Sequence, residues 1–224
     1  MYLIDSANIK AIKHLSQTYA FDGITTNPTL MSKENRTDFL HHVKELSETL
    51  EGKRLYVQIN ADDASRMGEE ARAFTRVAAP PVSVKIPATL EGYKAMRALC
   101  GEFDIAATAV VDFHQALMSI DAGASSVIVY VNRMLASGLR PFHLIGQLRA
   151  HIDALGINVH IIGASFKTQE EASKAIVSGA HRVSVAPSLL ERMFLKPLTQ
   201  RSVSQFTDDF RERYKQTHIK DKSQ

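Results

Sequence analysis

Short apolar runs alternate along the whole chain with longer segments that have helical periodicity. Eight runs are rich in β-branched residues, which is typical of parallel strands that are buried on both faces. They lie at residues 2–4, 23–24, 55–57, 82–84, 105–107, 127–129, 159–162 and 183–185. We predict a strand at each of these eight runs.

The segments between the runs have the spacing of amphipathic helices. Phe39, Val43, Leu46 and Leu50 recur at the interval of one helix face. Comparable patterns run through 93–99, 113–120 and 141–152. A further helix is predicted after Thr168 and Glu171, which have the form of a capping box, and it is expected to end at Gly179.

Eight strands that alternate with helices in 224 residues indicate an α/β protein, a single (β/α)8 TIM barrel. An open, doubly wound sheet is the alternative, because periodicity does not show whether a sheet closes. The pattern around Phe206, Phe210 and Tyr214 predicts an extra C-terminal helix, with a basic tail, at about 200–224. We therefore expect one domain over residues 1–224.

Composition narrows the class of protein further. Hydrophobic residues make up 45% and charged residues 23%. The net charge is +3, and acidic and basic residues are interspersed along the chain. This charge balance does not indicate a nucleic-acid-binding protein, and no apolar run is long enough for a membrane span. A single cysteine, Cys100, and an N-terminus without the pattern of a secretory signal lead us to expect a cytoplasmic protein.

Polar side chains follow most of the predicted strands. In a TIM barrel the carboxyl ends of the strands meet at one mouth, where the chemistry of the fold takes place. In chain order these residues are Asp5, Thr25, Thr26, Asn27, Gln58, Lys85, Thr108, Tyr130, Asn132, Arg133, Ser165 and Lys167. Their convergence predicts a functional site at this mouth.

Lys85 lies between apolar residues in the string PPVSVKIPAT. A lysine inside the mouth is desolvated, which lowers its pKa and frees a neutral amine to attack a carbonyl. The alternative is a lysine at the outer rim with its ammonium in water.

Several neighbouring residues have structural alternatives as well. Asp5 is placed to transfer protons beside the amine, but Asp-Ser-Ala-Asn also opens a helical pattern, which favours Asp5 as its N-cap. Gln58 can orient water or substrate, or be a core amide that bonds to the backbone. The threonines 25, 26 and 108 are also ordinary strand residues.

Arg133, Ser165 and Lys167 suggest an anion site. Two cations, a hydroxyl and the backbone N–H groups at a helix start suit a phosphate, and the loops after strands 7 and 8 are its usual position in these barrels. The alternative is a surface charge and a loop hydroxyl. No metal-ligand spacing and no nucleotide-binding glycine motif occurs, so we expect neither a metal nor a cofactor.

The strings GITTNPTL, YVQINA, SVKIPAT with EG, TAV, YVNR and GASFKT follow one another in the chain. Their order resembles the small transaldolase family, and within it the fructose-6-phosphate aldolase branch. The resemblance covers essentially the whole chain, and the combination of TTNP, VKIP and ASFK is highly specific.

The resemblance implies the catalytic residues. Lys85 matches the Schiff-base lysine, and Asp5 matches the aspartate that assists proton transfer. Gln58, Thr108 and Tyr130 match the groups that hold a water and supply the acid and base. The aldolase branch is implied by Gln58 and Tyr130, because true transaldolases are expected to have glutamate and phenylalanine there.

The resemblance also implies how a sugar phosphate binds. Asn27 matches a residue that bonds to substrate hydroxyls, and Arg133 with Ser165 matches the phosphate clamp. The full set expected to bind substrate is Thr25, Thr26, Asn27, Asn132, Arg133, Ser165 and Lys167. No cofactor is implied, and the assembly implied is a homo-oligomer, a pentamer or a decamer.

Two departures from the family pattern lie beside the expected mouth. Leu135 stands where an aspartate is usual, and Val111-Asp112 replaces an aromatic-small pair. The function expected is reversible cleavage of fructose 6-phosphate to dihydroxyacetone and glyceraldehyde 3-phosphate. The alternatives are a transaldolase that transfers a dihydroxyacetone unit within the pentose phosphate pathway, and a non-catalytic sugar-phosphate-binding barrel. A phosphate-binding isomerase is a third alternative, but it would use a glutamate base at a strand end, and the sequence has none there.

Overall fold

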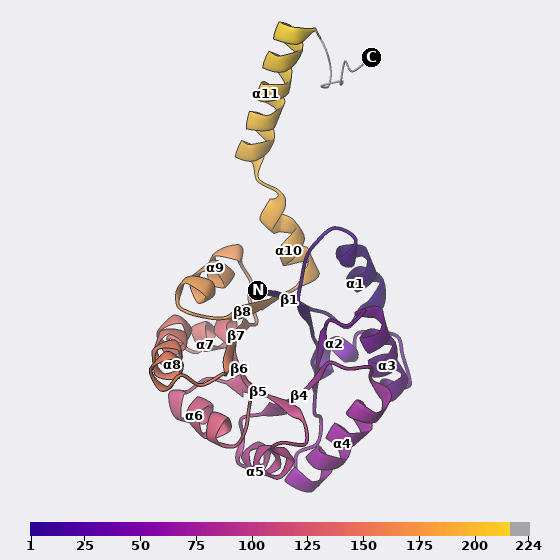
Figure 1. Cartoon of the computed structure of the whole chain (residues 1–224), viewed down its shortest axis with the longest axis vertical. Helices are drawn as coiled ribbons and strands as arrows, with labels where there is room; N and C mark the ends of the chain where they lie inside the picture. Colours follow the sequence, from indigo (N-terminus) through magenta and orange to yellow (C-terminus); the bar gives the residue numbers. More distant parts are fainter. Residues whose placement is uncertain (216–224) are drawn as a thin grey trace. The chain divides into compact units, whose positions relative to one another are not determined.

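Eight parallel strands close into a barrel in the computed structural model, which describes residues 1–215 (Figure 1). The strands are β1 (Tyr2–Asp5), β2 (Gly23–Thr25), β3 (Arg54–Gln58), β4 (Val82–Pro87), β5 (Asp104–Val110), β6 (Ser126–Tyr130), β7 (His160–Ala164) and β8 (Arg182–Val185). Each strand pairs with the next, and β1 pairs with β8 through Leu3 and Ser184, among others. The predicted (β/α)8 barrel is confirmed, and the open sheet is excluded.

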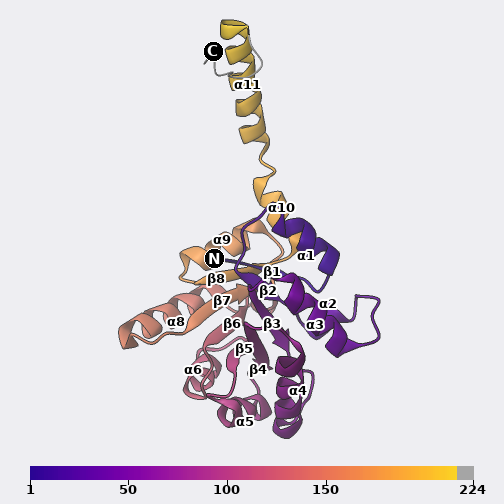
Figure 2. The ribbon, with the colours of Figure 1, turned by 45° about the vertical axis from the view of Figure 1, so that its right-hand side comes forward.

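Helices follow the strands, and those between β1 and β8 lie around the outside of the ring (Figures 1 and 2). They are α1 (Ile9–Ser16), α2 (Pro28–Met31), α3 (Phe39–Thr49), α4 (Ala64–Val77), α5 (Leu90–Leu99), α6 (Phe113–Asp121), α7 (Val131–Ala136), α8 (Pro141–Leu155), α9 (Gln169–Val177), α10 (Pro187–Phe194) and α11 (Pro197–Tyr214). The predicted face of α3 is buried at Val43, Leu46 and Leu50. Thr168 caps α9 as expected, since its hydroxyl accepts from the N–H of Glu171 at 3.1 Å.

The observed elements differ from the predicted ones mainly at their ends. β4 continues past Lys85 to Pro87, and β5 continues past Thr108 to Val110. β7 begins at His160, so Val159 lies just before the strand rather than in it. The C-terminal helix runs from Pro197 to Tyr214, and residues 216–224 of the predicted basic tail lie outside the described residues.

The chain divides into two units, the barrel over Met1–Leu189 and a second unit that begins at Leu190. The second unit contains the extra helix α11. None of the helices within residues 1–215 combines the length and the hydropathy needed to span a bilayer.

The interior of the barrel is packed with apolar side chains. Its cluster of buried residues comprises Leu3, Tyr56, Ala106, Ile128, Ile162 and Ala164, with Tyr130 packed against it. Because the interior is filled, a ligand reaches the barrel only at an end of the strands.

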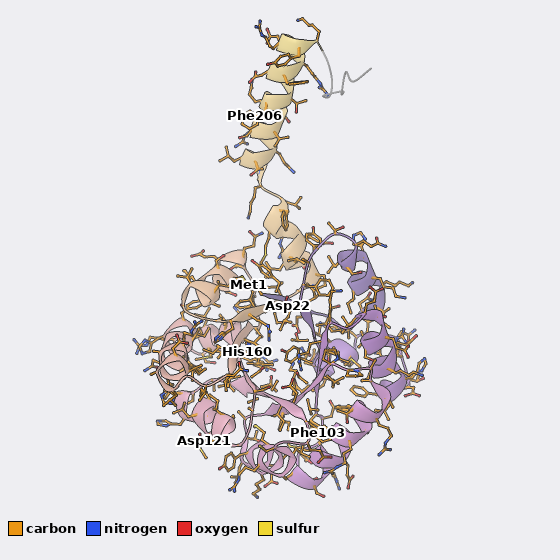
Figure 3. The ribbon with its side chains drawn as sticks, in the orientation of Figure 1. Met1, Asp22, Phe103, Asp121, His160 and Phe206 are labelled. Carbon is orange, nitrogen blue, oxygen red and sulfur yellow. The ribbon has the colours of Figure 1, made fainter. Side chains whose placement is uncertain are left out.

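The amino ends of the strands carry a separate polar cluster. Arg54 at the start of β3 pairs with Asp104 at the start of β5, and the Ser83 hydroxyl bonds to the same carboxylate. Arg182 at the start of β8 donates to the Tyr56 hydroxyl at 3.4 Å. Figure 3 labels His160, which is the first residue of β7 and therefore lies at the same end of the barrel. These contacts close the barrel at the end opposite the predicted mouth.

Candidate active site

A pocket of about 90 Å³ opens among the carboxyl ends of the strands. It is lined by Asp5, Thr25, Asn27, Lys85, Ile128, Tyr130, Arg133, Ala164 and Ser165. Seven of these nine residues belong to the predicted site, so the structure brings these seven together at one mouth.

Lys85 on β4 is the buried cation of this pocket, with a side chain only 3% exposed. Its Nζ donates to the backbone carbonyl of Thr26 at 2.5 Å. Burial lowers the pKa of Lys85 to about 8, although the Asp5 carboxylate opposes this shift. Lys85 therefore lies inside the mouth rather than at the rim, and near neutral pH a useful fraction of it is the nucleophilic free amine.

Asp5, at the end of β1, lines the same pocket as Lys85, and the two charged groups influence each other. Its Oδ1 accepts from the Thr25 hydroxyl at 2.7 Å. Burial raises the pKa of Asp5, and the Lys85 charge and the bond from Thr25 oppose that rise. The alternative of Asp5 as a helix cap is wrong, because Asn8 caps α1 by accepting from the N–H of Ala11 at 2.8 Å.

Of the three residues expected to supply the acid and base, Tyr130 lines the pocket, whereas Thr108 and Gln58 are not among its lining residues. The Thr108 hydroxyl donates to the Tyr130 phenol oxygen at 3.3 Å. Gln58 is the register partner of Lys85 on β3, and its Oε1 is buried with no hydrogen-bond partner among the described residues. An unpaired buried carbonyl oxygen is costly, and this atom keeps its capacity to accept a hydrogen bond.

A bulge in β5 accompanies the position of Thr108. The pairing with β6 shifts between Ala107 and Val110, and Ala109 has a φ of +58°. Bulges of this kind redirect a side chain beside a site. Here the irregular stretch includes Thr108, whose hydroxyl bonds to Tyr130.

Arg133 and Ser165 form the cationic side of the pocket. The Arg133 guanidinium lies over the Tyr130 ring, 4.9 Å from its centroid. Ser165 is a non-glycine residue in the left-handed region, with a φ of +63°. Asn27 uses its Oδ1 to cap α2 through the N–H of Leu30 at 2.9 Å, so its amide nitrogen remains as a donor for a ligand.

Three residues predicted to bind substrate lie beside the pocket instead of lining it. The Thr26 hydroxyl donates to the Tyr56 carbonyl at 3.1 Å, so Thr26 acts on the site only through its own carbonyl, which holds Lys85. Asn132 donates to Glu171 at 3.2 Å, and the Lys167 side chain is exposed.

Two residues at the site were not singled out in the sequence. Ser184 on β8 is 1% exposed, and its hydroxyl lies 2.5 Å from that of Thr25. Glu171 was noted only as part of a capping box. A serine between two valines of a buried strand was the available signal for Ser184, because such a residue is placed to point into the barrel.

Neither departure from the family pattern lines the pocket. Leu135 is 38% exposed, and Asp112 caps α6 by accepting from His114 and Gln115. Within the described part of the chain, no group of three or more histidine, cysteine, aspartate or glutamate side chains is arranged to hold a metal ion.

A parallel barrel whose mouth holds a buried lysine beside a carboxyl, a phenol and an arginine carries the groups that catalysis by an amine requires. Residues 2–223 match the family described as Transaldolase/Fructose-6-phosphate aldolase. The chain belongs to this family, and it is an enzyme of the aldolase/transaldolase class.

Relatives of full length support this assignment. A Streptococcus pneumoniae protein described as "Probable fructose-6-phosphate aldolase" is 31% identical over 211 residues, 93% of this chain and 95% of that protein. A Bartonella quintana protein described as "Probable transaldolase" is 32% identical, over 94% of this chain and 96% of that protein. Among solved structures, a mandelate oxidase variant has a TM-score of 0.58 over 84% of this chain and 65% of its own, at 15% identity, which concerns the fold alone.

Proposed function

We propose that the chain is a cofactor-independent Schiff-base aldolase that reversibly cleaves fructose 6-phosphate to dihydroxyacetone and glyceraldehyde 3-phosphate. The observation that carries this proposal is Lys85, buried in a small pocket with a pKa lowered to about 8, with Tyr130 and Arg133 in the same lining. An amine of this kind attacks a ketone without a metal or an organic cofactor.

The reaction begins when neutral Lys85 attacks the C2 ketone and water leaves, giving an iminium. Tyr130 then removes the proton of the C4 hydroxyl, through a water held by Gln58 and Thr108. As the C4 carbonyl forms, the C3–C4 bond breaks and its electron pair moves into the iminium, which becomes an enamine. Protonation at C3 and hydrolysis return the free amine and release dihydroxyacetone.

Asp5 serves the steps that form and hydrolyse the iminium. It lies at the amine and its raised pKa suits a group that alternately binds and releases a proton. Arg133 and Ser165 bind the phosphate of the sugar and then that of the departing aldehyde. Asn27 donates to substrate hydroxyls near the reacting carbons.

Gln58 and Tyr130 favour an aldolase over a transaldolase. An aldolase must protonate its enamine, and a phenol 3.3 Å from a threonine hydroxyl beside the intermediate is a proton source. A transaldolase instead keeps the enamine until a second aldehyde arrives. We expect the double substitution Gln58→Glu with Tyr130→Phe to reduce release of dihydroxyacetone and to favour transfer.

The first test incubates the protein with fructose 6-phosphate alone and measures both products. Sustained release of dihydroxyacetone and glyceraldehyde 3-phosphate supports the aldolase. Turnover only after erythrose 4-phosphate is added identifies a transaldolase instead. Turnover of either kind excludes a non-catalytic sugar-phosphate-binding barrel, because such a protein gives no products.

A second test assigns the nucleophile. Borohydride reduction in the presence of dihydroxyacetone traps an amine adduct whose mass is read on the intact protein. Lys85→Met is expected to abolish both the adduct and turnover. Lys10→Met, a change at an exposed lysine of α1, is the matched control and keeps both. An adduct that survives Lys85→Met assigns the nucleophile to another residue.

We also propose that the protein is cytoplasmic and assembles as a homo-oligomer, a pentamer or a decamer. The support is the resemblance of the sequence to its family, together with the apolar side chains of α11, which a single helix cannot bury by itself. Phe206, labelled in Figure 3, and Leu198, Phe210 and Tyr214 are among them. Light scattering of the full chain measures the assembly, and a monomeric mass contradicts it.

A further inference from the structure

A line of buried hydroxyls leads from β8 to Asp5. The Ser184 and Thr25 hydroxyl oxygens are 2.5 Å apart, and Thr25 donates to Asp5 Oδ1 at 2.7 Å. Ser184 is 1% and Thr25 2% exposed. Because β1 lies between β2 and β8 in the barrel, the two hydroxyls reach the Asp5 side from the strands on either side of it.

The number of hydrogens on each hydroxyl determines which group donates and which accepts. Each hydroxyl has one hydrogen to donate and two lone pairs to accept with. When Asp5 is ionised, the hydrogen of Thr25 points to Oδ1, so the hydrogen between the two hydroxyls belongs to Ser184. The chain of donation therefore runs from Ser184 to Thr25 and on to Asp5.

We propose that Ser184 is a positioning residue for proton transfer by Asp5. By donating to Thr25, Ser184 commits the single hydrogen of Thr25 to Oδ1 of Asp5, and Oδ2 is left to exchange its proton in the pocket. Donation in series also polarises the Thr25 hydroxyl and strengthens its bond to the carboxylate. The role of Asp5 itself rests on the proposed function.

Other groups also act on the Asp5 proton. Lys85 from β4 faces Asp5, and Tyr130 and Arg133 from β6 and α7 line the same pocket. Burial already raises the pKa of Asp5, and the bond from Thr25 counters that rise. Loss of the Ser184 hydroxyl weakens this counter-effect, so the Asp5 pKa is expected to rise further.

The experiment measures the Asp5 titration and the pH profile of kcat/KM in four proteins: the original chain, Ser184→Ala, Thr25→Val and the double variant. A bond worth about 1 kcal/mol corresponds to about 0.7 pH unit, so Ser184→Ala should move the acid limb upward by roughly half a unit, with KM unchanged. Thr25→Val should shift it further. The double variant should match Thr25→Val alone, because Ser184 acts only through Thr25.

Two controls accompany these variants. Ser184→Thr keeps a hydroxyl and should restore the profile, which also covers the case in which Ser184→Ala does not fold. Ser126→Ala removes another buried serine, at the start of β6, and should leave the acid limb in place. An unchanged Asp5 titration in Ser184→Ala, or additive shifts in the double variant, overturns the proposal.

The Asp5 titration also separates this proposal from the function on which it rests. Carbon-13 NMR of the labelled Asp5 carboxyl reads the proton without any turnover. A chain that gives no lysine adduct and no products refutes the proposed function, whether or not the Asp5 titration depends on Ser184.

Discussion

The side-chain amide of Asn132 donates to Glu171 Oε1 at 3.2 Å, and this bond joins α7 to α9. The second oxygen of Glu171 accepts from the backbone N–H of Lys167 at 2.7 Å. The backbone N–H of Asn132 in turn donates to the carbonyl of Ser165 at 2.9 Å. One carboxylate thus holds the segment of Arg133 against the loop of Ser165, the two parts of the proposed phosphate site.

Glu171→Ala is expected to weaken binding of the phosphate. Loss of two hydrogen bonds of about 1 kcal/mol each corresponds to roughly a tenfold or larger rise in KM for fructose 6-phosphate. The rate of adduct formation with unphosphorylated dihydroxyacetone should stay the same. Steady-state kinetics and borohydride trapping measure the two effects.

Glu170→Ala is the matched control, because Glu170 pairs only with Lys174 on the exposed side of the same helix among the contacts described. Equal rises in KM for the two variants would mean that α9 as a whole, rather than the bridge through Glu171, supports the phosphate site.

Adduct formation should depend on pH through Lys85. Only the neutral amine attacks the ketone, and burial lowers the pKa of Lys85 to about 8, so the rate should rise with pH and level off above that value. Rapid quenching with borohydride across the pH range measures this profile. A midpoint near that of a free lysine would contradict the role of burial.

Asp5→Asn should move that midpoint to lower pH. The Asp5 carboxylate favours the charged form of Lys85 and so opposes the effect of burial. Without the carboxylate, desolvation acts alone and the pKa of Lys85 falls further. The adduct should then form at lower pH, although multiple turnover is lost with the proton transfer. A midpoint that rises would refute this account of the pair.

Lys85→Met should stabilise the fold at neutral pH. The pKa of Lys85 falls from 10.5 to about 8 on folding, so the unfolded chain binds more protons between these values and stability rises with pH there. Below about pH 8 the full cost, about 3 kcal/mol, is present.

The expected gain for Lys85→Met at pH 7 is about 2 kcal/mol, smaller than that cost because Asp5 loses its counter-charge. The difference between the two proteins should shrink as the pH approaches 10.5. Urea unfolding of both proteins at several pH values measures it. A variant that is less stable at neutral pH would show that the ion pair outweighs desolvation.

Ala109 offers a test of the bulge in β5. A β-branched residue at its φ of +58° is strained, so Ala109→Val should lower the free energy of unfolding by about 1–3 kcal/mol. It should also lower kcat, because Thr108 is displaced from Tyr130. Ala109→Gly removes the strain but adds freedom to the unfolded chain, and should change stability by less than about 1 kcal/mol. Equal kcat values in all three proteins would separate the bulge from catalysis.

Much of the site followed from the sequence because parallel strands bring their carboxyl ends to one mouth. Asp5 and Tyr130 end β1 and β6, and Lys85 lies two residues before the end of β4, so position along the strands placed them together. Local sequence was misleading at Asp5, since the choice between Asp5 and Asn8 as the cap of α1 depends on where the chain leaves the barrel.

Contacts between distant segments were beyond the reach of sequence pattern. The partner of Thr26 is the Tyr56 carbonyl, and that of Asn132 is a carboxylate on another helix. Such pairs depend on the stagger of neighbouring strands and the angle of each helix, neither of which periodicity records. The sequence does not predict the bulge at Ala109 either, because alanine usually avoids a positive φ and so gives no signal for one.

The polar cluster at Arg54 and Asp104 fills the amino ends of the strands, so a ligand reaches the barrel from the carboxyl ends. A sugar that reaches Lys85 enters past Arg133, which is exposed, and whatever leaves must return by the same route. In the proposed cleavage the three-carbon fragment stays bonded to Lys85 after the C3–C4 bond breaks, whereas the phosphorylated aldehyde is held by no covalent bond. The covalent bond to Lys85 therefore makes the aldehyde depart first and the dihydroxyacetone second, and both leave through the end of the barrel at which Lys85 lies.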